Sequence, residues 1–118
     1  MNKLNKLIGN RILKANADIT TIIPVNSGGE AKIEIPISLV FVDYTLNIYN
    51  SFIIKGVTDA SLSTLEDLVV QACAETDTEI ILCLDKSVEL IVDMSDNGYN
   101  GPEALSLYGP DNLFVVWD

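Results

Sequence analysis

Carboxylate and amide side chains gather in the stretch DMSDNGYNGPEALSLYGPD, residues 93–111, where their spacing could hold a calcium ion. A calcium loop of the EF-hand type needs oxygen ligands at its first, third and fifth positions and glycine at its sixth. Asp93, Ser95, Asn97 and Gly98 meet these requirements. The twelfth position needs a bidentate glutamate but is Ala104, and the residues before the stretch have a strand pattern instead of an entering helix. We therefore expect no metal site and interpret the stretch as a strand end followed by turns.

A second acidic group is formed by Glu75, Asp77 and Glu79. In an extended segment a spacing of two residues points all three side chains the same way, and such a group could bind a cation or act on a substrate. The chain has no histidine, which removes the commonest general base and any Ser–His or Cys–His pair. Because no other residues supply a nucleophile activator or a phosphate loop, we expect no enzyme activity and no cofactor.

Charge is distributed unevenly along the chain. Its first fourteen residues contain four of the seven basic residues, Lys3, Lys6, Arg11 and Lys14, and no acid. The remainder holds three basic residues against all 17 acids, a charge of −14, and the whole chain carries −10. A negative body repels nucleic acid and anionic membranes, so we expect neither as a partner. A basic protein is the natural complement, although acidity also serves solubility alone.

Length and composition bound the domain organisation and the compartment. A chain of 118 residues with 48% apolar content predicts a single domain, residues 1–118, with a real core. We expect a cytoplasmic protein, because no apolar run reaches membrane-spanning length and the first residues lack the pattern of a secretory signal. Cys73 and Cys83 have no CxxC spacing and lie among apolar residues, so we interpret them as small buried hydrophobes.

Apolar periodicity predicts two helices and several short strands. Residues 2–14 place apolar side chains at helical spacing, and a second helix is predicted from Ser61 or Ser63 to about Thr76, with acids in its first turns. Hairpins are predicted between residues 19–25 and 31–35, between 80–84 and 88–92, and between 104–108 and 113–117. Residues 37–42 and 45–54 are predicted to be strands.

The two halves of the sequence have similar patterns. LNKLIGNRILKANAD, starting at Leu4, aligns with LSTLEDLVVQACAETD, starting at Leu62, and each is followed by an apparent hairpin with an aspartate at its turn. Amphipathic elements produce such matches by chance as readily as duplication does. The predicted fold class is therefore α+β, a two-layer domain with two helices on one face of a mainly antiparallel sheet and an internal helix–hairpin duplication as one interpretation.

Tyrosines and carboxylates are the candidate contacts for a partner. Tyr99 lies between two turns and is predicted to be the most exposed tyrosine, whereas Tyr49, Tyr108 and Trp117 are predicted to pack on the core. The predicted partner-binding residues are acidic apart from Tyr99; they are Glu75, Asp77, Glu79, Asp85, Asp93, Asp96, Tyr99 and Glu103.

The tail GYNGPEALSLYGPDNLFVVWD resembles the closing segment of a group of small acidic bacterial proteins that end in GPEA, then GP, then VVW. The matching residues are Gly101, Pro102, Glu103, Ala104, Gly109, Pro110, Val115, Val116 and Trp117. LIGNRIL, residues 7–13, also looks like the opening of such proteins. Some members of the group are immunity proteins of polymorphic or contact-dependent growth-inhibition toxin systems. The resemblance covers about a fifth of the chain, supports fold kinship more than function, and transfers no functional residue.

The leading functional prediction is an immunity protein that binds a cognate bacterial toxin domain, a basic nuclease for instance, through its acidic surface and blocks it without catalysis. The alternative is a structural or regulatory module that self-associates through an exposed strand edge and uses its acidity for solubility. Both predictions allow a monomer or a weak homodimer.

Overall fold

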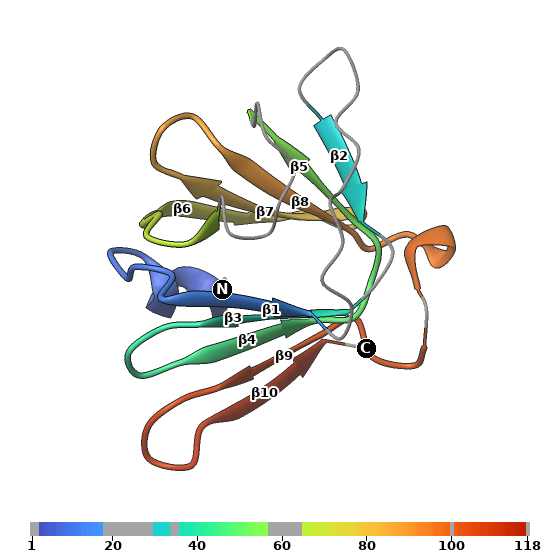
Figure 1. The fold of residues 1–118 in the computed structure, drawn as a ribbon. Coiled ribbons are helices and arrows are strands. Elements are labelled where there is room, and N and C mark those ends of the chain that lie inside the picture. Colours follow the sequence, from blue (N-terminus) through green and yellow to red (C-terminus); the bar gives the residue numbers. More distant parts are fainter. Residues whose placement is uncertain (1–2, 18–29, 34–35, 57–64, 100, 118) are drawn as a thin grey trace.

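Two five-stranded antiparallel sheets form the fold, one layered against the other (Figure 1). The computed structural model describes residues 3–17, 30–33, 36–56, 65–99 and 101–117. Sheet I has the strand order β1-β3-β4-β9-β10, and sheet II has the order β2-β5-β8-β7-β6. The bounds are η1 Lys3–Leu7, β1 Lys14–Ala17, β2 Glu30–Ile33, β3 Ile37–Val40, β4 Thr45–Ile48, β5 Phe52–Lys55, β6 Val70–Glu75, β7 Glu79–Leu84, β8 Glu89–Asp93, η3 Asp96–Gly98, β9 Leu105–Tyr108 and β10 Phe114–Trp117.

The core lies between the two sheets and follows from the period of two along each strand. In β7 every second side chain is buried, and β3, β4 and β8 alternate in the same way. The inward-facing residues of both sheets belong to one apolar cluster, which includes Leu39, Leu46, Leu82, Leu90 and Leu107 at no measurable exposure. The other face of each sheet is left to contact solvent or partners.

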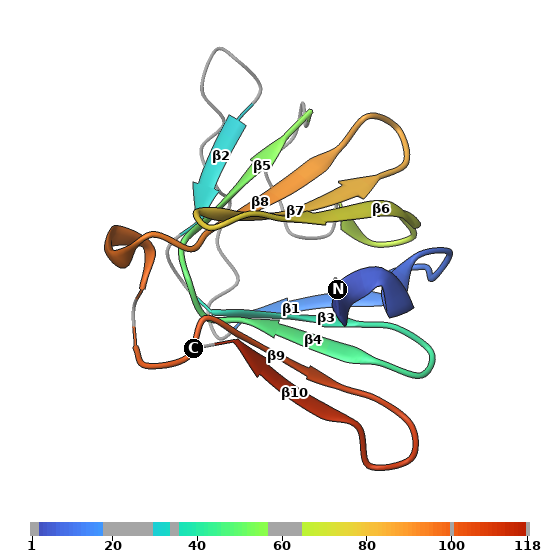
Figure 2. The same cartoon turned by 180° about the vertical axis from the view of Figure 1, so that it is seen from behind.

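Two of the places where the chain passes from one sheet to the other are equivalent. The chain passes from β4 in sheet I to β5 in sheet II, and from β8 in sheet II to β9 in sheet I (Figures 1 and 2). Each crossing strand then pairs with the strand that precedes the other crossing: β5 pairs with β8, and β9 pairs with β4. The two crossings also bond to each other, because the Ser51 amide donates to the Gly98 carbonyl and the Tyr49 amide to the Ala104 carbonyl, both at 2.9 Å.

One edge of sheet I is also tied to one edge of sheet II. Arg11 and Val69, which are 58 positions apart, form an antiparallel bridge. The Ile12 amide donates to the Leu68 carbonyl at 2.8 Å. On the other side of the bridge, the Val70 amide donates to the Asn10 carbonyl at 2.9 Å. These two bonds flank the bridge, so residues 10–12 run antiparallel to residues 68–70.

The first predicted helix is wrong beyond its first turns. Within the predicted range only η1 is helical, as a short 3-10 segment, and β1 begins at its last residue, Lys14. Leu4, Leu7 and Ile12 are fully buried as the apolar stripe required, whereas Ile8 is 44% exposed. The chain leaves the helix at Gly9, whose φ of +87° suits glycine and ends the helical path.

The second predicted helix is wrong in its described part, since residues 70–75 form β6 and residues 61–64 lie outside the described residues. The α+β fold class is therefore wrong, because two antiparallel sheets replace one sheet covered by two helices. Asp67, at the position equivalent to Gly9, also has a positive φ, of +72°. Pairing of β6 with β7 overrides the helical spacing of the apolar residues, because it places Val70 opposite Leu84 with its side chain fully buried.

The two C-terminal hairpins are confirmed, with β7 pairing β8 and β9 pairing β10. Their turns contain residues with positive φ, Lys86 and Ser87 in one and Asp111 and Asn112 in the other. Residues 45–54 form two strands, β4 and β5, separated by the crossing. Residues 19–25 of the first predicted hairpin lie outside the described part, and β2 pairs with β5. Neither described 3-10 helix has the length and apolar character to cross a membrane.

Candidate functional site

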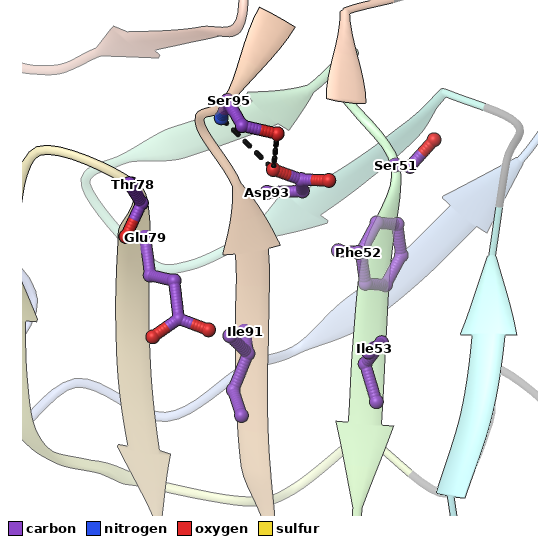
Figure 3. Close-up of a pocket in the computed structure, with 8 residues that line it drawn as sticks. All are labelled: Ser51, Phe52, Ile53, Thr78, Glu79, Ile91, Asp93 and Ser95. Atoms are coloured by element: carbon purple, nitrogen blue, oxygen red, sulfur yellow. Dashed lines mark hydrogen bonds between the residues drawn. The ribbon is translucent and has the colours of Figure 1, made fainter. Parts of the chain in front are cut away.

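A hollow of about 350 Å³ lies on the outer face of sheet II, where β5, β8 and the start of β7 run side by side (Figure 3). We call it the acidic hollow because two carboxylates belong to its wall. Its lining combines these carboxylates with hydroxyls and apolar side chains: Ser51, Phe52, Ile53, Thr78, Glu79, Ile91, Asp93 and Ser95.

Glu79 and Asp93 occupy directly opposite positions on β7 and β8. Opposite residues of an antiparallel pair point to the same face, with Cβ atoms about 4.5–5.5 Å apart. Glu79 is exposed and Asp93 is half-buried. Within the described chain, no lysine or arginine forms an ion pair with either carboxylate. Two like charges thus share one surface without a compensating cation from the described residues, an arrangement that a cationic guest would stabilise.

Several hydrogen bonds fix Asp93 in place. Its Oδ1 accepts from the backbone amide of Ser95 at 2.9 Å and from the Ser95 hydroxyl at 2.6 Å (Figure 3). Its backbone amide donates to the Ser51 carbonyl at 3.0 Å, and its carbonyl accepts from Nδ2 of Asn50 at 2.8 Å. Asn50 is fully buried. The β4–β5 crossing therefore holds the end of β8, so this wall of the hollow is preorganised.

Gly98 in η3 packs against the other side of Asp93. A Cβ at this position would collide with the Asp93 carbonyl oxygen and would lie 2.7 Å from the Cβ and Cγ of Asp93. The Ser51 amide also donates to the Gly98 carbonyl at 2.9 Å. Glycine is thus needed here because two backbone segments approach closely. In this way η3 packs directly against Asp93, one of the two acids of the hollow.

The floor of the hollow is aliphatic. Ile53 and Ile91 are paired across β5 and β8, and both are half-buried on the outer face. Ile81 of β7 continues the same row beside Ile91. In Figure 3 the carboxylate of Glu79 lies alongside Ile91, so charge and apolar surface adjoin. This combination suits a guest with an aliphatic stem and a positive end, as lysine and arginine side chains have.

Only part of the predicted acidic surface comes together. Glu79 and Asp93 share the hollow, and Asp77 lies in the adjoining turn between β6 and β7, exposed and next to the lining residue Thr78. Glu75 does not point the same way, because its Oε1 accepts from the indole Nε1 of Trp117 at 3.1 Å. The predicted row of Glu75, Asp77 and Glu79 is broken because the chain reverses direction between β6 and β7.

The remaining predicted residues lie apart from the hollow or serve the fold. Asp85 is in the turn at the far end of β7, where its Oδ1 accepts from the Val69 amide at 3.0 Å. Asp96 is exposed in η3, whereas Glu103 is exposed on the connection to β9 and lines a separate hollow with Tyr49. Tyr99 is half-buried and packs against the core, so it is less exposed than the 48% exposed Tyr108, which reverses the order predicted for these two tyrosines.

Sequence reasoning missed the neutral residues of the hollow. Ser51 and Ile53 lie at the start of β5, whereas Thr78 precedes β7, and only the pairing of β8 with both β5 and β7 brings these two segments together. One local signal existed: a serine two residues after an aspartate favours the turn in which Ser95 binds Asp93. The alternation along the strand also predicted that Ile91 points outward. It did not predict which residues of the neighbouring strands lie beside Ile91.

The two cysteines do not provide a second reactive centre. The Cys73 thiol donates to the Leu4 carbonyl at 3.4 Å, and burial, helped by nearby Cys83, raises the pKa of this thiol from 9.0 to about 11. The thiol therefore stays protonated and poorly nucleophilic near neutral pH. Both cysteines are free and half-buried, and no cluster of three or more metal-ligating side chains occurs among the residues that the structure describes.

No protein family, no curated protein and no solved structure matches this chain. The resemblance of the tail to immunity proteins consequently stays a prediction. In the fold this tail is the β9–β10 hairpin of sheet I, on a different sheet from the acidic hollow.

Proposed function

We propose that this protein is a non-catalytic binding module that docks a lysine or arginine side chain of a basic partner protein in the acidic hollow. The observation that carries the proposal is the opposed pair of carboxylates, Glu79 and Asp93, beside an isoleucine floor and without a compensating cation from the described chain. The net charge of −10 supports the same class of partner, because it attracts basic proteins over longer distances.

The two parts of the hollow contribute in different ways. The stem of a docked arginine would cover Ile53 and Ile91, and burial of its apolar area contributes about 25 cal/mol per Å². Its guanidinium would donate charge-assisted hydrogen bonds to the carboxylates, which also set the orientation. Because Asp93 is already held by Ser95, its carboxylate loses little conformational freedom on binding.

We further propose that the partner is a basic toxin domain, which makes this chain an immunity protein. Such a protein would dock a lysine or arginine of the toxin in the same hollow. The test of this role is a pull-down with the product of a neighbouring toxin gene at increasing salt concentration. A complex that does not form even at low salt would reject that role and leave the docking of cations to be tested separately.

The chemistry of the hollow can be tested without knowing the partner. We would titrate isoleucine-methyl-labelled protein with N-acetyl-argininamide and, as a matched neutral guest, with the citrulline analogue. The expected result is a shift of the Ile53 and Ile91 methyl signals with the arginine compound, strongly reduced by added salt. Equal shifts with both compounds would contradict the proposal, because recognition would then not depend on positive charge.

Variants locate the site. Glu79→Gln and Asp93→Asn each keep the shape and remove one charge, so each should weaken binding of the arginine compound by about 3- to 10-fold. Glu103→Gln is the matched control, because Glu103 is an exposed acid outside the hollow. If Glu103→Gln weakened binding as much as Glu79→Gln, general surface charge would be responsible and the hollow would not be the site.

A further inference from the structure

A line of aliphatic side chains extends from the acidic hollow across the outer face of sheet II. Ile53 of β5 lies opposite Ile91 of β8, and Ile91 lies opposite Ile81 of β7. Ala74 of β6 continues the line beside Ile81. The three isoleucines are half-buried and Ala74 is exposed. We call these four residues the aliphatic row; Ile53 and Ile91 also line the hollow, whereas Ile81 and Ala74 lie beyond it.

The two flanks of the aliphatic row differ in charge. On one flank are Glu79 and Asp93, each two positions from an isoleucine of the row, with exposed Asp77 in the adjoining turn. Figure 3 shows the Glu79 carboxylate alongside Ile91. On the other flank Glu89 lies opposite Lys55, so that flank carries both signs. Charge complementarity therefore favours an occupant that has an apolar face with basic residues along one side of it.

The spacing of the aliphatic row matches the turns of an α-helix. Neighbouring strands lie about 4.8 Å apart, so the row spans about 14 Å from β5 to β6. An α-helix advances about 5.4 Å per turn, and side chains at positions i, i+4, i+7 and i+11 share one face over about 16 Å. A helix that lies across the strands thus places about one apolar side chain over each member of the row.

An extended segment fits the same surface less well. Side chains on one face of a strand are about 6.6 Å apart, which differs from the spacing of the row by about 2 Å at every step. The backbone amides of such a segment would also lie against aliphatic side chains, where they find no hydrogen-bond acceptors. A helix bonds its own backbone internally, so it can cover an aliphatic surface without this cost.

We infer that the aliphatic row and its acidic flank bind a basic amphipathic α-helix of the partner protein. The inference rests on the proposed function, because the lysine or arginine docked in the hollow belongs to the basic side of this helix. About three turns of the helix cover the row, with aliphatic side chains on Ile53, Ile91, Ile81 and Ala74. The acids on one flank alone determine which way the helix is rotated about its axis.

A pair of designed peptides tests the helix without knowledge of the partner. The first peptide has about 15 residues, with leucine at positions i, i+4, i+7 and i+11, arginine along one side of this apolar face, and alanine elsewhere. The matched control peptide has the same composition and charge, but its leucines are distributed around the helix. N-acetyl-argininamide is titrated in parallel, because it reaches the hollow and is too short to cover the row.

Isoleucine-methyl spectra of the unaltered protein report on each part of the surface. The leucine-faced peptide should shift the signals of Ile53, Ile91 and Ile81 together and bind at least about 10-fold more tightly than the control peptide, because it alone buries the whole row. N-acetyl-argininamide should shift Ile53 and Ile91 more than Ile81. Difference circular dichroism should show that the leucine-faced peptide gains helix when it binds.

A variant at the far end of the row separates the helix from the hollow. Ala74→Lys should weaken binding of the leucine-faced peptide about 10-fold, because the new side chain places bulk and positive charge under the helix. Val42→Lys is the matched control, since Val42 is 75% exposed in the β3–β4 turn of sheet I and the change alters net charge equally. N-acetyl-argininamide should bind both variants equally well.

The outcomes distinguish failure of the helix from failure of the hollow. Equal affinity of the two peptides, while N-acetyl-argininamide still binds by its charge, would overturn the inference and leave the proposed function intact. Charge-independent binding of N-acetyl-argininamide would reject the hollow and, with it, the inference. Peptide binding without a gain of helix, or equal losses in Ala74→Lys and Val42→Lys, would overturn the inference. A shift of the Ile81 signal with protein concentration alone would overturn it too, because a second copy would then cover the row.

Discussion

Replacing Gly98 by alanine should destabilise the protein and weaken cation binding together, whereas the same replacement at Gly101 should do neither. Both glycines lie on the connection between β8 and β9. At Gly98 a methyl group would meet the Asp93 side chain at 2.7 Å and collide with the Asp93 carbonyl oxygen. At Gly101 a methyl group would have no atom within 4 Å. The pair therefore isolates contact with Asp93 from the general effect of replacing glycine.

The structure sets the size of the difference. Inserting a methyl group into a packed contact costs about 1–3 kcal/mol. Displacing Asp93 also weakens the bonds at 2.6 and 2.9 Å from Ser95, which adds about 1 kcal/mol for a partly exposed carboxylate. Alanine at the unstrained Gly101 reduces the entropy of the unfolded chain and stabilises by about 0.4–1 kcal/mol. The two variants should thus differ by about 2–5 kcal/mol in free energy of unfolding.

Urea unfolding monitored by circular dichroism measures this difference. With a slope of about 1–3 kcal/mol per molar urea, the midpoint of Gly98→Ala should lie roughly 0.7–5 M below that of Gly101→Ala. The N-acetyl-argininamide titration should show weaker binding in Gly98→Ala only. Equal midpoints and equal affinities would refute the reasoning, since they would mean that η3 neither packs on Asp93 nor positions its carboxylate.

Three further measurements test other parts of the fold. Gly56→Ala should lower the free energy of unfolding by about 1–3 kcal/mol more than Gly9→Ala, as measured by urea midpoints. Both glycines have a positive φ, but only at Gly56 would the added methyl group collide with backbone, the Ser87 carbonyl oxygen. Asn50→Ala should cost about 1–3 kcal/mol in the same assay, because the β8 carbonyl loses a buried donor, and a cost under 0.5 kcal/mol would contradict this. In the unaltered protein, iodoacetamide at pH 8 should modify Cys73 about 100-fold more slowly than a thiol of ordinary pKa 9.0, as read for each cysteine by peptide mass spectrometry. Since the folded pKa of about 11 exceeds that of the unfolded chain, stability should also fall as pH rises from about 9 toward 11.

Local turn chemistry explains which elements the sequence could predict. Asp85-Lys86-Ser87 and Pro110-Asp111-Asn112 adopt tight turns with positive φ between strongly apolar strands, so both hairpins were predictable without knowledge of the rest of the chain. Burial of Leu4, Leu7 and Trp117 also followed from their apolar character, whatever element carried them.

Tertiary pairing decided the elements that local pattern described wrongly. Apolar residues between 65 and 72 fit the spacing of a helix, but Val70 lies against Leu84 in a strand pair and Asp67 leaves the helical path with positive φ. The loss of both predicted helices changed the fold class, because strands from the same segments extend and join two sheets.

The sequence by itself determined an acidic chain without histidine, two C-terminal hairpins and much of the apolar core. Tertiary structure alone decided that Glu79 lies opposite Asp93 on the neighbouring strand and that Glu75 instead binds the indole of Trp117. The physical reason is that strand register and strand order depend on contacts between distant segments, and a shift of one residue would have turned each of these side chains to the opposite face.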